Sequence, residues 1–123
     1  MKLVLAEPES DEVIATAAEW STAASSVVAR VEVGLAARRV GGKAVAQADR
    51  VVAALDLVPL GADIVELATT RLDPALRALD AIHVASALSL GDDLGAMLTF
   101  DRRQRIAAAA AGLSVDPGGA RDR

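Results

Sequence analysis

Three acidic residues stand where the apolar pattern around them would place uncharged side chains. Glu32 lies four positions after Val28, on the apolar side of an expected helix. Asp80 lies four positions after Leu76, on the apolar side of another, and Asp101 directly follows an apolar segment that is typical of a buried strand. Carboxylates are costly to bury without a partner, and a hard cation such as Mg²⁺ or Mn²⁺ removes that cost. The three acids therefore indicate a candidate metal site, provided that the fold brings them together.

Each of these residues also has an ordinary structural interpretation. A single acid at the edge of an apolar stripe is usually solvated, and Asp101 stands where an N-cap would satisfy the free amides of the next helix. His83, one turn after Asp80, could be a proton shuttle, although such a histidine is more often a satisfied core residue or a support for a neighbouring ligand. The acids favour metal chemistry only when they are taken together.

The composition excludes several other chemistries. The 123 residues include no cysteine and one histidine, which excludes disulfides, thiol nucleophiles and a multi-histidine zinc site within one chain. Aromatic residues make up 2%, which argues against a base-stacking platform for RNA. The formal net charge is −4, so only a local basic patch could bind a nucleic acid. Arg102, Arg103 and Arg105 form one candidate patch, and a solvated helix face is the alternative.

No apolar run reaches the roughly 18–20 residues of a membrane span, and the apolar start of the chain is too short for a signal-peptide core. We therefore expect a cytoplasmic protein with no membrane contact.

Helical and extended patterns alternate along the chain, which predicts an α/β domain with a parallel sheet. In such folds ligands bind beyond the carboxyl ends of the strands. One domain is expected over residues 1–115, and the Pro/Gly-rich, charged residues 116–123 are expected to form a disordered tail. The stripes Val28-Val31-Leu35 and Leu76-Leu79-Val84 are expected to face the core. We expect helices over 8–20, 26–40, 43–54, 62–72, 74–90 and 101–111, and strands over 21–25, 55–60, 95–100 and 113–115.

Four segments together resemble a known family. They are residues 3–10 (LVLAEPES), 25–33 (SSVVARVEV), 79–88 (LDAIHVASAL) and 98–103 (LTFDRR). The third is close to the pattern LDAxHLAxAL and is the most specific. On these residues the chain resembles a PIN domain of the VapC type, the toxins of bacterial toxin–antitoxin systems. The resemblance implies a three-layer α/β fold in which helices flank a short parallel sheet.

The resemblance also assigns roles to single residues. Glu32, Asp80 and Asp101 correspond to the second, third and fourth conserved acids of the family, and all three are implied metal ligands and catalytic residues. Thr99 is the hydroxyl neighbour in the family's TxD motif and is counted with the catalytic group.

One part of the family pattern has no counterpart in the sequence. Residues 3–10 resemble the first helix of the family and the turn after it, so the preceding central strand and its aspartate are expected to be missing. Three explanations stay open: a true start about ten residues upstream of Met1, a trimmed chain, and a decayed or repurposed toxin. The intact remaining motifs favour the first.

The implied function is an endoribonuclease toxin that uses Mg²⁺ or Mn²⁺ to cleave RNA phosphodiesters. The resemblance also implies that the protein forms a homodimer and binds a cognate antitoxin. We expect Arg102 and Arg103 to contact the RNA. The alternative is a catalytically impaired relative that dimerises and binds an antitoxin. A metal-dependent phosphatase would use similar carboxylates, but the segment around Asp80 gives it no support.

Overall fold

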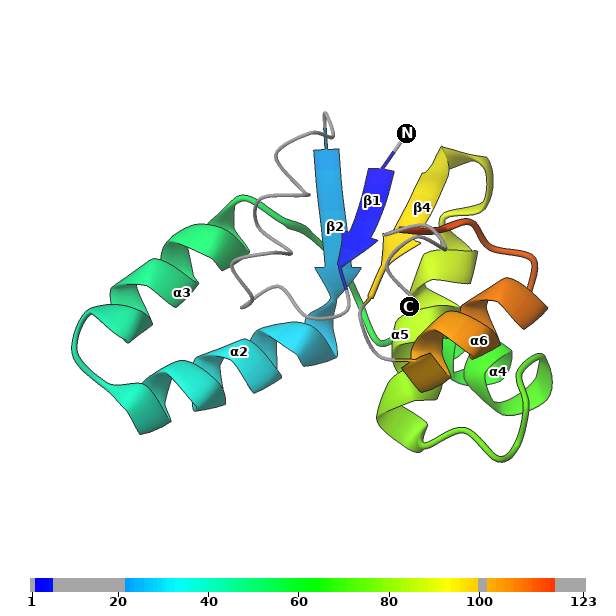
Figure 1. Ribbon diagram of the computed structural model, residues 1–123, viewed down its shortest axis with the longest axis horizontal. Coiled ribbons are helices and arrows are strands. Elements are labelled where there is room, and N and C mark those ends of the chain that lie inside the picture. The colour runs from blue at the N-terminus through cyan, green and yellow to red at the C-terminus, as the bar shows by residue number, and fades with distance from the viewer. Residues whose placement is uncertain (1, 6–21, 100–101, 117–123) are drawn as a thin grey trace.

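Strands and helices alternate in the computed structural model, which describes residues 2–5, 22–99 and 102–116 (Figure 1). The expected helix over residues 8–20 lies outside these ranges. A short 3-10 turn, Gly91–Asp93, precedes β4. The elements are β1 (Lys2–Leu5), β2 (Thr22–Ser26), α2 (Val27–Val40), α3 (Lys43–Ala53), β3 (Asp56–Val58), α4 (Ala62–Thr70), α5 (Ala78–Ser89), β4 (Leu94–Leu98), α6 (Arg102–Ala110) and β5 (Val115–Asp116).

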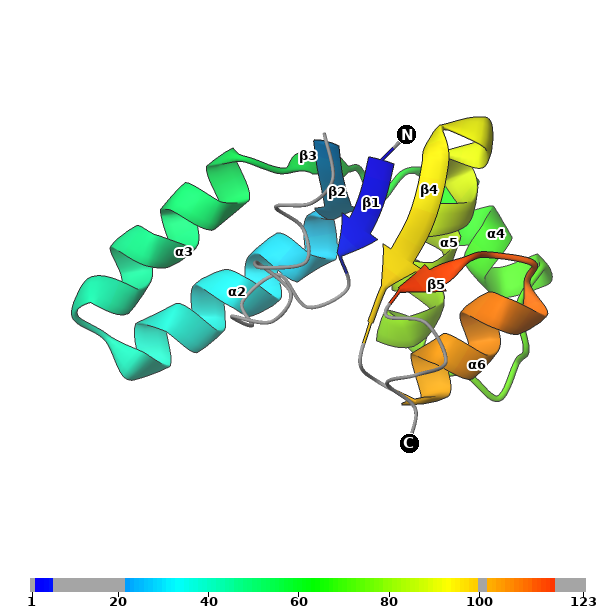
Figure 2. The same cartoon turned by 45° about the horizontal axis from the view of Figure 1, so that its top comes forward.

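The five described strands form one sheet in the order β3-β2-β1-β4-β5, and every neighbouring pair is parallel (Figure 2). The sheet confirms the expected α/β fold class. From β1 the chain first builds one side of the sheet, through β2 and β3, and then the other, through β4 and β5. Such a reversal beside β1 is where ligands bind in open parallel sheets.

The centre of the sheet differs from the expectation that its first strand is missing. Lys2–Leu5 forms β1 and pairs with both β2 and β4. A run of four residues is too short for periodicity to separate a strand from a helix, and the central position supplies backbone partners on both sides. None of the four residues of β1 is acidic, so β1 itself does not carry the family's first aspartate.

Helices flank this sheet. Helix α5 packs against β2 and β4, α4 packs on α5, and α6 contacts α5 and β5. The pair α2 and α3 extends to the other side as an arm (Figure 1). The core consists of small and medium apolar side chains, namely Ala24, Val84, Ala87, Met97 and Ala108.

The buried face of α2 is not the one that its larger residues suggest. Ala29, Val33 and Ala37 are buried, whereas Val31 and Leu35 are 59% and 46% exposed. The expected stripe was therefore wrong. Residues spaced four apart share a helix face, and the small side chains of the buried set allow a close approach of the neighbouring elements.

Helix α5 begins later than Asp73-Pro74 predicts. The Asp73 carboxylate accepts a hydrogen bond from the amide of Ala75 at 2.9 Å, which closes a local turn. The extended backbone of Arg77 (φ −66°, ψ 150°) then places the first helical residue at Ala78. Leu79, expected to face inward, is 46% exposed, whereas Val84 is fully buried.

Two helices are followed by a glycine with a positive φ angle. Gly41 (φ 77°) follows α2, and Gly112 (φ 88°) follows α6. The amide of Leu113 donates to the carbonyl of Ala108 at 3.0 Å, as in a Schellman cap. Asp116, expected in the tail, is the last residue of β5, and residues 117–123 lie outside the described ranges. None of the helices in the described part of the chain combines the length and the apolar character needed to cross a bilayer.

Candidate active site at the carboxyl ends of the strands

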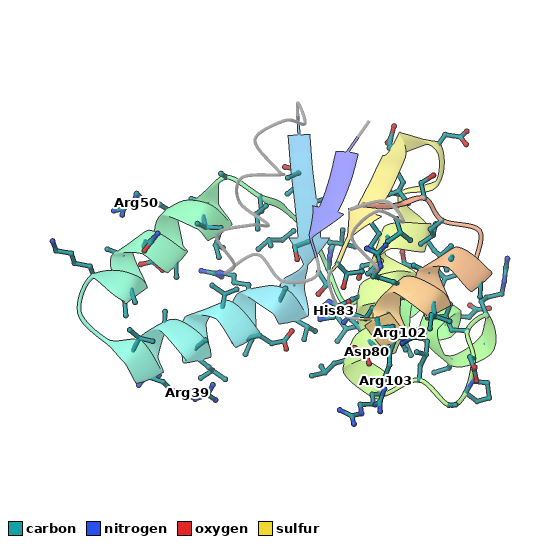
Figure 3. The ribbon with its side chains drawn as sticks, in the orientation of Figure 1. Arg39, Arg50, Asp80, His83, Arg102 and Arg103 are labelled. Carbon is teal, nitrogen blue, oxygen red and sulfur yellow. The ribbon has the colours of Figure 1, made fainter. Side chains whose placement is uncertain are left out.

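The expected site residues come from elements that meet at one end of the sheet. Helix α2 starts directly after β2, and Thr99 follows β4. Helix α5, which carries Asp80 and His83, packs against both strands. In Figure 3 these two residues lie at the carboxyl ends of the strands, with Arg102 and Arg103 on the first turn of α6 near Asp80. Arg39 and Arg50 lie far away on the arm.

A buried histidine connects the start of α2 to Glu32. His83 Nδ1 is 2.9 Å from the Ser26 hydroxyl, and Nε2 is 3.0 Å from Glu32 Oε1. The Ser26 hydroxyl oxygen also accepts the amide of Ala29 at 3.2 Å and so caps α2. The His83 side chain is 4% exposed and that of Glu32 is 46% exposed. We call this chain Ser26–His83–Glu32 the histidine relay.

The partners of His83 fix its tautomer. A carboxylate can only accept, so Nε2 carries the proton that is donated to Glu32. In the neutral ring Nδ1 is then an acceptor, and the Ser26 hydroxyl donates to it. Both ring nitrogens are engaged, so this geometry favours a supporting role for His83 over a proton shuttle.

A second chain holds Asp80. Gln104 Nε2 donates to Asp80 Oδ1 at 2.7 Å, and the Thr99 hydroxyl donates to Gln104 Oε1 at 3.0 Å. Because Asp80 only accepts and Thr99 has one proton to give, the contacts fix which end of the Gln104 amide faces which partner. Gln104 is 5% exposed and Thr99 is fully buried. We call this chain Thr99–Gln104–Asp80 the amide relay.

The Thr99 backbone is held as well. Its carbonyl accepts a hydrogen bond from Arg105 Nη1 at 3.2 Å. Thr99 is thus fixed through its side chain and its main chain, and the orientation of Gln104 depends on a residue that has little freedom to move.

Helix α5 places the two relays side by side. Asp80 and His83 are three residues apart, which puts them on neighbouring positions of one helix face. Glu32 and Asp80 are therefore each held by a relay that includes a residue of α5. Asp101 lies outside the described residues, and no group of three potential metal ligands occurs within the described ranges. The convergence of all three acids stays a prediction.

The sequence interpretation did not identify Gln104 or Ser26 as site residues. Gln104 follows Asp101 by three positions, the spacing of a capping box, which was the available signal. Ser26 precedes the apolar start of α2 and could have been assigned as an N-cap. No local pattern reveals that each side chain also reaches a partner on α5.

Comparison with known proteins gives consistent matches over most of the chain. Residues 2–110 match the PIN domain family. Ribonuclease VapC46 of Mycobacterium tuberculosis is 40% identical over 115 residues, which are 94% of this chain and 88% of that protein. Ribonuclease VapC35 of the same species is 37% identical over 129 residues, covering 98% of this chain and 93% of the relative.

A similar solved structure is that of FitAB bound to the IR36 DNA fragment. It superposes with a TM-score of 0.61 at 17% identity and covers 94% of this chain and 93% of its own. At this identity the likeness shows a shared fold.

Proposed function

Since the chain belongs to the PIN domain family, and its relatives include ribonucleases of the VapC type, we propose that it is an endoribonuclease toxin that cleaves RNA phosphodiesters with Mg²⁺ or Mn²⁺. The observation that carries the proposal is the pair of relays. They orient Glu32 and Asp80 at the carboxyl ends of the strands, where α/β folds bind ligands.

The two carboxylates fit a hard cation. Within the described ranges, Glu32 and Asp80 each use one oxygen for a protein hydrogen bond, which leaves the second oxygen of each for another ligand. Carboxylate oxygens are ligands that Mg²⁺ and Mn²⁺ prefer. Glu32 and Asp80 would hold the ion, and Asp101 is the proposed third ligand. When bound, the ion supplies an activated water and neutralises charge on the phosphate.

The remaining residues support these acids or the RNA. His83 and Gln104 orient the carboxylates, and Thr99 acts through Gln104, so we assign these three as positioning residues. Arg102 and Arg103 are exposed on the first turn of α6 and would contact RNA phosphates. Their positive charge offsets the repulsion between the acids and the phosphate.

We propose the same assembly for this chain as the resemblance implies: a homodimer that a cognate antitoxin neutralises. The similarity to VapC ribonucleases supports this assignment.

A cleavage assay tests the function. The purified protein is incubated with total bacterial RNA in the presence of Mg²⁺ or Mn²⁺, with EDTA, and with EDTA followed by excess metal. We expect discrete RNA fragments that disappear with EDTA and return with added metal. Fragments that form equally well in EDTA would contradict the metal-dependent mechanism.

A second candidate function follows from the composition of β1. Its residues, Lys2 to Leu5, include no carboxylate, and the resemblance leaves the first conserved aspartate of the family without a counterpart in this sequence. A relative with an incomplete acidic set would act as a dimerising, antitoxin-binding module. Tight antitoxin binding without RNA cleavage in either metal would favour this candidate.

Gln104→Leu is expected to weaken metal binding and cleavage about 10–100-fold, because Asp80 loses the donor that orients it. The measurement is the initial rate against Mn²⁺ concentration. A positioning role predicts that high Mn²⁺ restores much of the rate. Gln47→Leu, on exposed α3, is the control and should leave the metal dependence unchanged. A rate that does not respond to Gln104→Leu would remove the amide relay from the mechanism.

Arg102→Ala combined with Arg103→Ala is expected to weaken RNA binding and to reduce its salt dependence. Each lost contact with a single-stranded phosphate lowers the slope of log K against log salt by about 0.7, so the pair removes about 1.4. The matched control is Arg39→Ala with Arg50→Ala on the arm, which removes the same charge. Equal slopes in the two double variants would exclude Arg102 and Arg103 from the interface.

A further inference from the structure

A groove adjoins Asp80 on the outer side of the candidate site. It lies between the segment 71–77, which joins α4 to α5, and one face of α6, and its volume is about 570 Å³. This volume falls within the range of about 300–1,000 Å³ that is usual for small-ligand sites. Asp80 lines the groove together with three arginines, so a ligand here would touch the proposed metal site.

Apolar side chains make up much of the lining of the groove. Ile106 is 60% exposed although it is a large aliphatic residue, and it faces the groove from α6. The other apolar residues that line the groove are Leu72, Ala75, Leu76, Ala107, Ala110 and Ala111. A contiguous apolar surface beside charged residues is typical of a surface that binds a partner or ligand.

Three of the residues that line the groove are arginines. Arg71, Arg77 and Arg103 are exposed and line it, in a chain whose net charge is −4. Within the described ranges the Arg71 and Arg77 guanidinium groups have no hydrogen bond or ion pair. Asp73 also lines the groove, but one of its carboxylate oxygens accepts the amide of Ala75. Asp80 lines the groove as well, so three arginines face two acids and the formal charge of the lining is still positive. This charge favours an anionic ligand.

These features match a nucleotide better than they match a protein helix. A nucleotide combines a flat apolar face with an adjacent phosphate, and RNA-binding proteins stack bases on guanidinium planes as well as on aromatic rings. The chain has few aromatic residues, so an aliphatic side chain would contact the base and guanidinium groups would contact the phosphates.

We propose that the groove between residues 71–77 and α6 is a subsite for one nucleotide of the RNA strand next to the scissile phosphate. The base lies against Ile106, and Arg71 and Arg77 hold the adjoining phosphates. The proposal rests on the proposed ribonuclease function, and it makes this groove a determinant of which RNA sequence is cut.

Binding is measured without cleavage, in the Asp80→Asn background. The probes are 12-nucleotide RNAs of oligo(A), oligo(C) and oligo(U). Arg71→Gln with Arg77→Gln should reduce the salt slope by about 1.4. Ile106→Ser should weaken the tightest complex about fivefold, at the low end of what one stacked base contributes. The matched controls on the arm are Arg39→Gln with Arg50→Gln, and Val40→Ser, whose side chain is 79% exposed.

A set of RNAs with a single abasic position identifies the base in the groove. An abasic site at one position should weaken binding to the protein that retains Ile106. The same RNA should bind the Ile106→Ser variant about as tightly as the intact RNA does, because both changes remove the same contact. Groove variants that behave like the arm variants would overturn the proposal. A shift from dimer to monomer in sedimentation, with RNA binding unchanged, would also overturn it and assign the groove to a second copy of the chain.

The outcome is separable from that of the proposed function. If the unmodified protein cleaves RNA and the groove variants bind like the controls, the subsite is wrong and the ribonuclease assignment stands. If RNA binds through the groove but no metal supports cleavage, the groove is an RNA-binding site, whereas the ribonuclease assignment and the role of the groove in selecting a cleavage site both fail.

Discussion

Asp80→Asn is expected to abolish RNA cleavage while the protein stays folded. Asparagine has the same shape, and its carbonyl oxygen can still accept from Gln104, so the amide relay persists. The negative charge that would hold the cation is lost. A metal supplies several kcal/mol of transition-state stabilisation, so we expect the rate to fall about a thousandfold or more.

The effect on stability should be small. Asp80 lies in the first turn of α5, where a negative charge interacts favourably with the helix dipole. Its loss should lower the free energy of unfolding by no more than about 1 kcal/mol. Thermal unfolding followed by circular dichroism measures this, beside initial rates of RNA cleavage.

Asp92→Asn is the control for this experiment. It makes the same chemical change in the exposed turn before β4, at the opposite end of the strand from Thr99. We expect full activity from it. Cleavage by Asp80→Asn at a rate near that of Asp92→Asn would show that the chemistry is not centred on Asp80.

His83→Phe is expected to have the second largest effect. Phenylalanine fills the space of the ring but gives Glu32 no donor and the Ser26 hydroxyl no acceptor. The loss of such a support typically costs about 10–100-fold in metal affinity or activity. The buried Ser26 hydroxyl, left without its acceptor, should destabilise the fold by about 1–3 kcal/mol.

The metal dependence distinguishes the possible roles of His83. For a positioning residue, the Mn²⁺ concentration needed for half-maximal rate rises, and saturating Mn²⁺ restores most of kcat. His83→Gln, whose amide can still donate to Glu32, should recover part of the loss. A fall in kcat that saturating Mn²⁺ does not repair, with an altered pH profile of the rate, would instead indicate that His83 transfers a proton.

The order of helices and strands was largely predictable, because its signals are local. Gly41 and Gly112 end helices in the structure as they do in the sequence pattern. Asp73-Pro74 is a strong entry signal, yet the turn closed by the Asp73 carboxylate delays α5 until Ala78. Two motifs with similar residue preferences compete there, and the sequence does not show which one prevails.

The orientation of α2 was not predictable from residue size. Val31 and Leu35 are exposed, while Ala29 and Ala37 are buried. In an alanine-rich helix several faces are almost equally apolar, and packing against neighbouring elements decides which is buried. β1 presents the same difficulty, because its four residues are too few to show a helical or extended periodicity. They form a strand because β2 and β4 provide backbone partners on both sides.

The candidate site was predictable by residue type but not by contact. Asp80 and Glu32 were recognisable because they interrupt apolar patterns and match a family motif. Their partners are far away in sequence: Glu32 and His83 are 51 residues apart, and Asp80 and Gln104 are 24 apart. Such pairs depend on the packing of α5 against its neighbours, which a single sequence does not encode in any local pattern.

Asp80 and His83 are three residues apart on α5, so the distance between these two members of the relays is set by the geometry of the helix. Three residues advance about 4.5 Å along the axis and turn through most of one revolution. Loops elsewhere can change in length without altering this spacing. A tilt or shift of α5 moves Asp80 and His83 together, so the distance between these two residues is conserved even when their position above the sheet is not. Glu32 on α2 and Gln104 on α6 keep their hydrogen bonds only if those helices follow α5.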